Sequence, residues 1–143
     1  MSLRLLLLLN FALAAYLTGL IWVVQLVVYP ALARVGKADF APYHAAHSRG
    51  MGYAAGAPMV LELALASWLA WVAYPVWGGV LAIGQLALAL ATWLATFFVA
   101  VPFHNRLSTH GYNYIALDGL TRTNWLRTLV WTARAGLLFW LLK

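Results

Sequence analysis

YHAAHSRGMG at residues 43–52, followed by YAAGAPMVLE at residues 53–62, places two histidines and an arginine at the mouth of an apolar helix. It also places a carboxylate, Glu62, inside that helix, which Pro58 is expected to kink. Charged side chains are costly inside a membrane helix and usually serve a function there. This stretch therefore predicts both a membrane-embedded helix and a functional site close to it.

The composition of the chain indicates an integral membrane protein in contact with the lipid bilayer. Of the 143 residues, 65% are hydrophobic and only 8% are charged, whereas about a quarter of the residues of a soluble domain are charged. The net charge of +6 comes from nine Lys and Arg that form no run. Anionic lipid headgroups explain this basicity better than nucleic acid does. Because cysteine is absent, disulfides and thiolate chemistry are excluded.

The apolar pattern predicts an all-α fold, an integral membrane four-helix up-and-down bundle in one transmembrane domain over residues 1–143. The runs are long enough to cross a hydrocarbon core of about 30 Å. The sequence leaves open whether copies of this bundle associate into a homo-oligomer. A cleavable signal peptide at the start is a further interpretation, but apolar character that continues to Val28 favours an uncut helix. The expected helices cover about 5–29, 51–73, 80–101 and 119–142, with polar connectors at 31–48 and 102–118.

Both polar connectors, and with them all four histidines, are expected on one face of the membrane. Most of the cations near helix ends lie on that side, and the positive-inside rule makes it cytoplasmic. Both termini then face outward, in what we expect to be a bacterial inner membrane. The cations on the histidine side are Arg34, Lys37, Arg49, Arg106 and Arg122, against Arg4 and Lys143 on the other side.

An intramembrane ion pair is expected between Glu62 and Arg127. Counted from the predicted helix starts, these residues lie roughly 16 and 12 Å from the same side, so they can meet. Asn124, Gln25 and Thr96 are expected as hydrogen-bond partners. In a catalytic interpretation Glu62 is the general base, and Arg127 and Asn124 stabilise an oxyanion. A purely structural ion pair fits the pattern equally well.

The histidines predict a metal site. His44 and His47 share a helical face, and His104 reaches the same side from the next connector, so the three imidazoles with a carboxylate suit iron, copper or zinc, and iron or copper is the metal we expect. His44 or His47 could also bind a haem together with His104. An unbroken helix would place His47 roughly 22 Å from Glu62, so Glu62 joins this site only if residues 50–52 break the helix. An ordinary polar patch at the headgroup level is the alternative to a metal site.

Two motifs late in the chain resemble those of a known family. They are VPFHNRL at residues 101–107 and NWLRT at residues 124–128. These motifs resemble the anthrone-oxygenase-like family of small four-helix membrane proteins, in which Asn105, Asn124, Arg127 and Thr128 fill family positions. Ala100 departs from the family, which often has Asn there, and the His44, His47 and Glu62 cluster has no place in the anthrone-oxidising members. The resemblance implies a membrane protein that oxidises a hydrophobic aromatic substrate with dioxygen.

We therefore expect a membrane oxidoreductase or oxygenase that acts on a lipophilic aromatic or quinone-like small molecule in a pocket between the helices. Gln25, Asn105 and Arg49 are further candidates for cofactor contacts. The alternative is a non-enzymatic carrier, a proton or anion path, or a small structural subunit that uses Glu62 and Arg127 with Arg134. A polar cluster open on one side favours the enzyme, whereas a continuous polar path favours transport.

Overall fold

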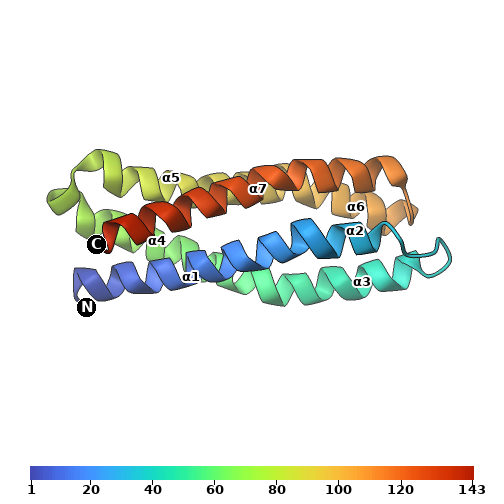
Figure 1. The fold of residues 1–143 in the computed structure, drawn as a ribbon, viewed down its shortest axis with the longest axis horizontal. Coiled ribbons are helices and arrows are strands. Elements are labelled where there is room, and N and C mark those ends of the chain that lie inside the picture. Colours follow the sequence, from blue (N-terminus) through green and yellow to red (C-terminus); the bar gives the residue numbers. More distant parts are fainter.

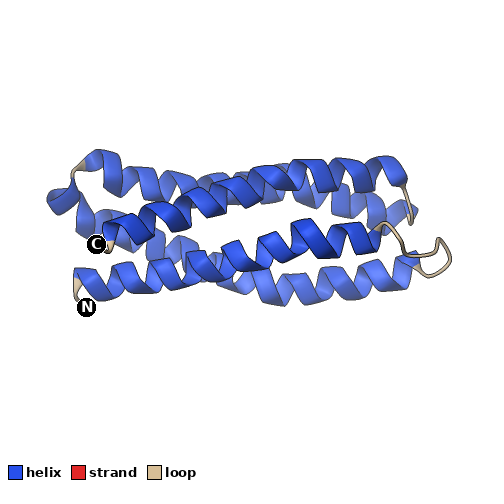
Figure 2. Ribbon diagram, viewed as in Figure 1, coloured by secondary structure: helices blue, strands red, loops and turns tan.

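Four long antiparallel helices form a bundle in the computed structural model, which describes residues 1–143 and contains no strand (Figures 1 and 2). The first three helices are each interrupted by one π-helical segment, labelled η. Both termini lie at one end of the bundle (Figure 1). The first helix comprises α1 (Leu3–Val23), η1 (Val24–Val28) and α2 (Tyr29–Leu32); the second α3 (Phe40–Met51), η2 (Gly52–Gly56) and α4 (Ala57–Trp77); the third α5 (Gly79–Ala95), η3 (Thr96–Ala100) and α6 (Val101–His110); the fourth is α7 (Tyr114–Leu141).

The helices extend further than the apolar pattern indicates, so most of each expected connector is helical. The connector at 31–48 reduces to a turn between Leu32 and Phe40, and the connector at 102–118 to residues 111–113. Gly111, with φ of 67°, follows α6, and the Asn113 side chain accepts a hydrogen bond from the backbone N–H of Ala116 at the start of α7. Apolar runs indicate which part of a helix could lie in a bilayer, whereas residues such as Gly111 and Asn113 determine where the helices end and begin.

The three π-helical segments share one sequence feature. Each has five residues and ends two residues before a proline. Proline has no backbone N–H, and its ring collides with the carbonyl four residues earlier, so a regular α-helical turn does not fit there. The segments and their prolines are Val24–Val28 with Pro30, Gly52–Gly56 with Pro58, and Thr96–Ala100 with Pro102. π-Helical turns are frequent at functional sites.

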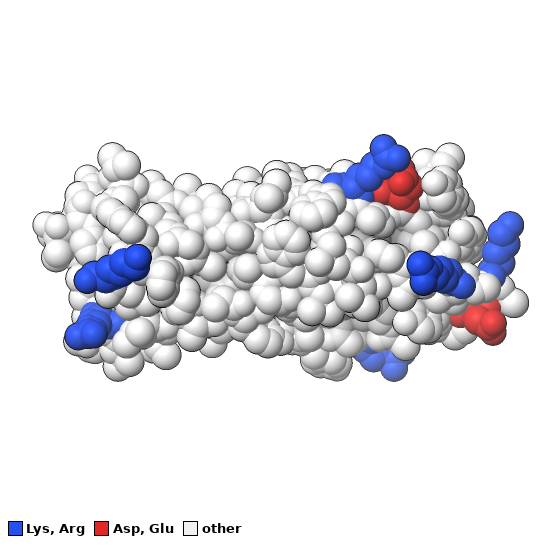
Figure 3. All heavy atoms as spheres, in the orientation of Figure 1, with Lys and Arg blue, Asp and Glu red and all other residues white.

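The surface of the bundle indicates a membrane protein. Three helices, Leu3–Leu32, Phe40–Trp77 and Gly79–His110, are long and apolar enough to cross a membrane. Lys, Arg, Asp and Glu on the visible face gather at the two ends and leave a wide uncharged band between them (Figure 3). The fourth helix, α7, is not among the three, because it carries Arg127 and Arg134, both of which are buried inside the bundle.

Gly119 allows α7 to approach α6 closely, which gives a first prediction. A Cβ at position 119 would lie 2.6 and 2.7 Å from the Cε1 and Cζ atoms of Phe103, whereas a Cβ at Gly136 would meet nothing within 4 Å. Gly119→Ala is therefore expected to destabilise the protein by about 1–3 kcal/mol through overpacking, less the roughly 1 kcal/mol that alanine gains in a helix.

The matched control for this prediction is Gly136→Ala, which should leave the melting temperature unchanged or raise it. Thermal unfolding of the detergent-solubilised protein, followed by circular dichroism, compares the two variants. Phe103→Leu in the Gly119→Ala background should recover stability, because it removes the ring that the new methyl group meets. Equal melting temperatures for the two alanine variants would contradict the close contact.

Candidate functional site

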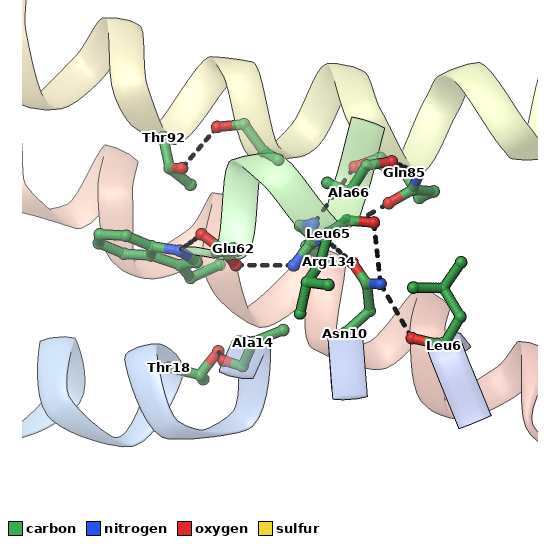
Figure 4. A network of polar contacts seen from close by, with 12 residues as sticks. Leu6, Asn10, Ala14, Thr18, Glu62, Leu65, Ala66, Gln85, Thr92 and Arg134 are labelled. Carbon is green, nitrogen blue, oxygen red and sulfur yellow. Dashed lines mark hydrogen bonds and ion pairs between the residues drawn. The ribbon is translucent and has the colours of Figure 1, made fainter. Parts of the chain in front are cut away.

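Glu62 and Arg134 form an ion pair in the interior of the bundle (Figure 4). Arg134 Nη1 lies 2.6 Å from Glu62 Oε1, and both side chains are fully buried. Trp131 Nε1 donates to Glu62 Oε2 at 3.1 Å, and Arg134 Nη2 donates to Asn10 Oδ1 at 3.0 Å and to Gln85 Oε1 at 3.3 Å. Asn10, Glu62, Gln85 and Arg134 come from α1, α4, α5 and α7, so each of the four helices contributes one member.

The remaining polar atoms of this network are also satisfied. Asn10 Nδ2 donates to the carbonyls of Leu6 and Leu65, and Gln85 Nε2 donates to the carbonyl of Ala66 (Figure 4). A buried network with every member paired fixes how the helices sit against one another. The network therefore has a structural role, and it leaves no unpaired donor or acceptor that could bind a ligand.

The expected pairing of Glu62 with Arg127 is wrong, because the second and fourth helices begin earlier in the chain than their apolar runs do. The second helix begins at Phe40 and α7 begins at Tyr114, both at the histidine end of the bundle. Measured from these starts, Glu62 lies about 33 Å along its helix, Arg134 about 30 Å and Arg127 only about 20 Å. Arg134 is thus the arginine at the level of Glu62.

The histidines and Glu62 belong to separate sites. The second helix runs without a break from Phe40 to Trp77, through residues 50–52. His47 and Glu62 are therefore roughly 22 Å apart along the helix, too far to share one ion. This confirms the expectation for an unbroken helix, in which Glu62 does not join the histidine site.

The three histidines predicted to act together do lie together. His44 Nε2 lies 3.1 Å from His104 Nδ1, and the hydroxyl of Tyr29 lies 3.2 Å from His104 Nε2. The His47 ring packs against that of His104, with centroids 6.0 Å apart and planes 28° apart. The cluster joins α2, α3 and α6 at the end of the bundle opposite the termini. His110 is exposed and bonds to Thr109 instead.

The cluster does not form a metal site in this arrangement. No group of three or more His, Cys, Asp or Glu is placed to hold a metal ion. His44 and His104 direct facing nitrogens at each other, and the second nitrogen of His104 faces Tyr29. His44 and His104 are hydrogen-bonded to each other in this arrangement, and the iron or copper site and the haem site stay predictions from the sequence.

A cavity of about 410 Å³ lies between the second and third helices, beside the histidine cluster. These helices pack together through α4 and α5 and again through α3 and α6, and the cavity lies between the two contacts, beside η2 and η3. Gly52, Val60 and Phe97 are exposed at its rim, so it opens on the side of the bundle. Its lining includes Tyr29, His47, Met51, Met59, Trp93, Thr96, His104 and Arg127.

Two buried hydrogen-bond donors of the cavity lining lack acceptors. Arg127 is only 6% exposed, and its Nε has no hydrogen-bond partner; the same holds for Nε1 of Trp93. The only ion pairs in the structure are Arg122 with Asp118 and Arg134 with Glu62, so Arg127 has no carboxylate partner. Tyr29 is a polar neighbour of its guanidinium, which lies 5.5 Å from the centre of the Trp131 ring. An unpaired donor is costly to bury and needs an explanation.

The other predicted site residues lie outside this cavity. Asn124 Nδ2 donates to Gln25 Oε1 at 2.8 Å, and Gln25 Nε2 donates to the carbonyl of Thr121, so these amides join the first and fourth helices. Asn105 and Arg49 are exposed. None of the candidates for cofactor contacts, and neither Asn124 nor Glu62, lines the cavity.

Two cavity residues, Tyr29 and Trp93, are not among the site residues predicted from the sequence. Tyr29 follows Gln25 by four positions and so lies on the polar face of the first helix, a signal that could have identified it. Trp93 gives no such signal, because an aromatic residue in an apolar run is typical of a lipid-facing or core position. Only the packing of the helices makes Trp93 part of the cavity lining.

Comparison with known proteins adds no relative: no family model, no curated protein and no solved structure matches the chain. The resemblance to the anthrone-oxygenase-like family therefore stays a prediction. What the cavity does has to be inferred from its residues and their geometry.

Proposed function

We propose that this protein is a membrane oxidoreductase that binds a lipophilic aromatic, phenol- or quinone-like molecule in the cavity beside Arg127. The observation that carries this proposal is that Arg127 and Trp93, two residues in the lining of a mainly apolar cavity, each have a buried N–H without a hydrogen-bond partner, Nε of Arg127 and Nε1 of Trp93. Donors without acceptors call for a ligand that brings the acceptor with it. A carbonyl or phenolate oxygen on an apolar ring system has this chemistry.

Placement in a bilayer supports a ligand that comes from the lipid. Two exposed cations flank the fourth helix: Arg122 lies in α7, and Lys143 follows the end of α7 at Leu141 by two residues. They are 21 positions apart, about 31 Å if counted along a helix and close to the thickness of a hydrocarbon core. In this placement α7 also crosses the membrane, with its buried arginines facing the other helices. The cation-rich histidine end is then cytoplasmic by the positive-inside rule. The side opening at Gly52, Val60 and Phe97 would face the lipid tails.

The residues of the cavity suit the oxidation of an acidic aromatic molecule. Loss of a proton from a phenol or an enolisable aromatic ketone gives an oxyanion, which Arg127 and Trp93 would stabilise by hydrogen bonds. The imidazoles of His47 and His104 are bases in the same lining. The oxyanion is richer in electrons than the neutral molecule, and dioxygen is the oxidant in our proposal. For anthrone the balance is one anthrone and one dioxygen to one anthraquinone and one water.

Transport along a polar path has less support from the geometry. Such a path would connect Arg127 with Glu62 and Arg134, yet the cavity lining includes only the first of these. Glu62 and Arg134 are fully buried and fully paired. The polar groups thus form one closed network and one cavity with a side opening, which is the pattern that favours an enzyme over a channel.

Anthrone oxidation tests the proposal. The purified protein in lipid vesicles should consume anthrone and dioxygen in equal amounts, faster than protein-free vesicles do, and the absorbance of anthraquinone reports the product. Arg127→Met should return the rate to that of protein-free vesicles, because the oxyanion loses its cation. Arg106→Met removes an exposed arginine at the same end and should leave the rate unchanged. A wild-type rate equal to that of protein-free vesicles would count against oxidase activity on this class of substrate.

A further inference from the structure

Four polar side chains form a continuous row that leads away from the cavity. Tyr29 Oη lies 3.2 Å from His104 Nε2, and His104 Nδ1 lies 3.1 Å from His44 Nε2. His44 Nδ1 in turn lies 3.5 Å from the Oγ of Ser108. Each imidazole thus uses one ring nitrogen toward the cavity and the other away from it.

The row connects a buried end with an exposed end. Tyr29 and His104 line the cavity, and Tyr29 is only 2% exposed. His44 is 1% exposed, whereas Ser108 is exposed on α6, toward the cation-rich end of the bundle. The link from His44 to Ser108 is the longest of the three and lies at the exposed end, where water can bridge it.

The chemistry of imidazole suits such a row to carrying protons. A neutral imidazole has one N–H and one free nitrogen, so it can accept a proton at one nitrogen and release another from the second. A proton taken up at His104 Nε2 would release the proton of Nδ1 to His44 Nε2. His44 would then release its Nδ1 proton to Ser108 or to water. One proton enters at the cavity and one leaves at the surface, and both rings end neutral.

The surroundings hold His44 in the orientation that this transfer needs. The ring of Phe40 stacks on the ring of His44 with centroids 5.6 Å apart and planes only 12° apart. Arg127 is the one arginine in the cavity lining, which contains no lysine, and no Asp or Glu lines the cavity to retain the proton. A cluster that only joined α3 to α6 would not need a link to Tyr29 at one end and to Ser108 at the other.

We propose that Tyr29, His104, His44 and Ser108 form a proton relay between the cavity and the water at the cation-rich end of the bundle. The relay rests on the proposed function for its purpose, because the ligand loses a proton in the cavity when the oxyanion forms, and a proton must return there when dioxygen is reduced to water. Tyr29 exchanges protons with the ligand, and the other three side chains transfer them to the surface.

His44→Phe tests the relay, because phenylalanine keeps the ring that stacks on Phe40 but cannot carry a proton. The first measurement needs no ligand: NMR of protein labelled with ¹⁵N-histidine follows the exchange of the His104 ring proton with water. This exchange should slow in His44→Phe and stay unchanged in His110→Phe, which alters a histidine outside the row. Ser108→Val should also slow the exchange of the His104 ring proton. This variant replaces His44→Phe as the test if His44→Phe does not fold.

The second measurement is anthrone oxidation by the same variants. His44→Phe should lower kcat about 100-fold, the scale of a lost proton-transfer group, and leave the affinity for menadione unchanged. Exchange of the His104 proton at the wild-type rate in both His44→Phe and Ser108→Val would overturn the relay. If the wild type oxidises no anthrone but the exchange slows as expected, the oxidase proposal fails and the relay stands.

Discussion

Arg134→Met is expected to destabilise the protein by about 3–5 kcal/mol, the usual result of removing one partner from a buried ion pair. The substitution leaves the carboxylate of Glu62 fully buried with only the Trp131 N–H to stabilise it. It also leaves the acceptor oxygens of Asn10 and Gln85 without the donor that they share. Chemical unfolding in detergent, followed by circular dichroism, measures the loss.

Two further variants isolate the effect of burial. Arg122→Met breaks the exposed pair with Asp118, which belongs to a class worth only about 0.3–0.5 kcal/mol. Glu62→Leu in the Arg134→Met background should recover much of the lost stability, because it removes the unpaired carboxylate. A loss in Arg134→Met no larger than that in Arg122→Met would show that the network does not hold the bundle together.

Arg127→Met is expected to have the opposite pattern of effects. It removes a buried cation that has no carboxylate partner, so the free energy of unfolding should stay unchanged or rise. The affinity for a quinone should fall about 10- to 100-fold, because a hydrogen bond from a charged donor contributes about 1.5–3 kcal/mol. Unfolding in detergent and ligand titration on the same preparation measure the two quantities. A variant that loses stability and affinity together would indicate that Arg127 is a structural residue.

These two arginines lie about two helical turns apart on α7 and have different environments. Arg134 donates to side chains from the other three helices, whereas Arg127 faces the cavity and stacks near Trp131. Opposite effects on stability and affinity would separate the structural site from the functional site on one helix. Similar effects would leave no reason to distinguish them.

The fold class could be predicted from the sequence because it depends on properties that a short window of residues carries. Apolar runs longer than a bilayer is thick, joined by short polar segments, predict helices that pack side by side. The meeting of His44, His47 and His104 also followed from local rules, since two residues three positions apart share a helix face and alternate connectors share a side. Both inferences need only the order of the elements.

The partner of Glu62 could not be predicted in the same way. Its choice between Arg127 and Arg134 depends on how far the second helix and α7 extend beyond the apolar runs. The second helix begins at residue 40 where 51 was expected, and α7 at residue 114 where 119 was expected, and the unequal errors move the expected partner by about two turns of α7. The role of Trp93 depends on the gap that the helices leave beside η2 and η3, which no local pattern encodes.

Quinone binding to the wild-type protein tests the central claim, that the cavity holds an oxygen-bearing aromatic molecule, most directly. Menadione and 2-methylnaphthalene share one ring skeleton and differ in the two carbonyl oxygens, and the chain has no cysteine for the quinone to modify. Equilibrium titration in lipid nanodiscs, corrected with protein-free nanodiscs, compares the two ligands. Saturable binding of menadione that Arg127→Met weakens, with no saturable binding of 2-methylnaphthalene, is the predicted result. Equal affinity for both ligands, or an affinity for menadione that Arg127→Met leaves unchanged, would contradict it.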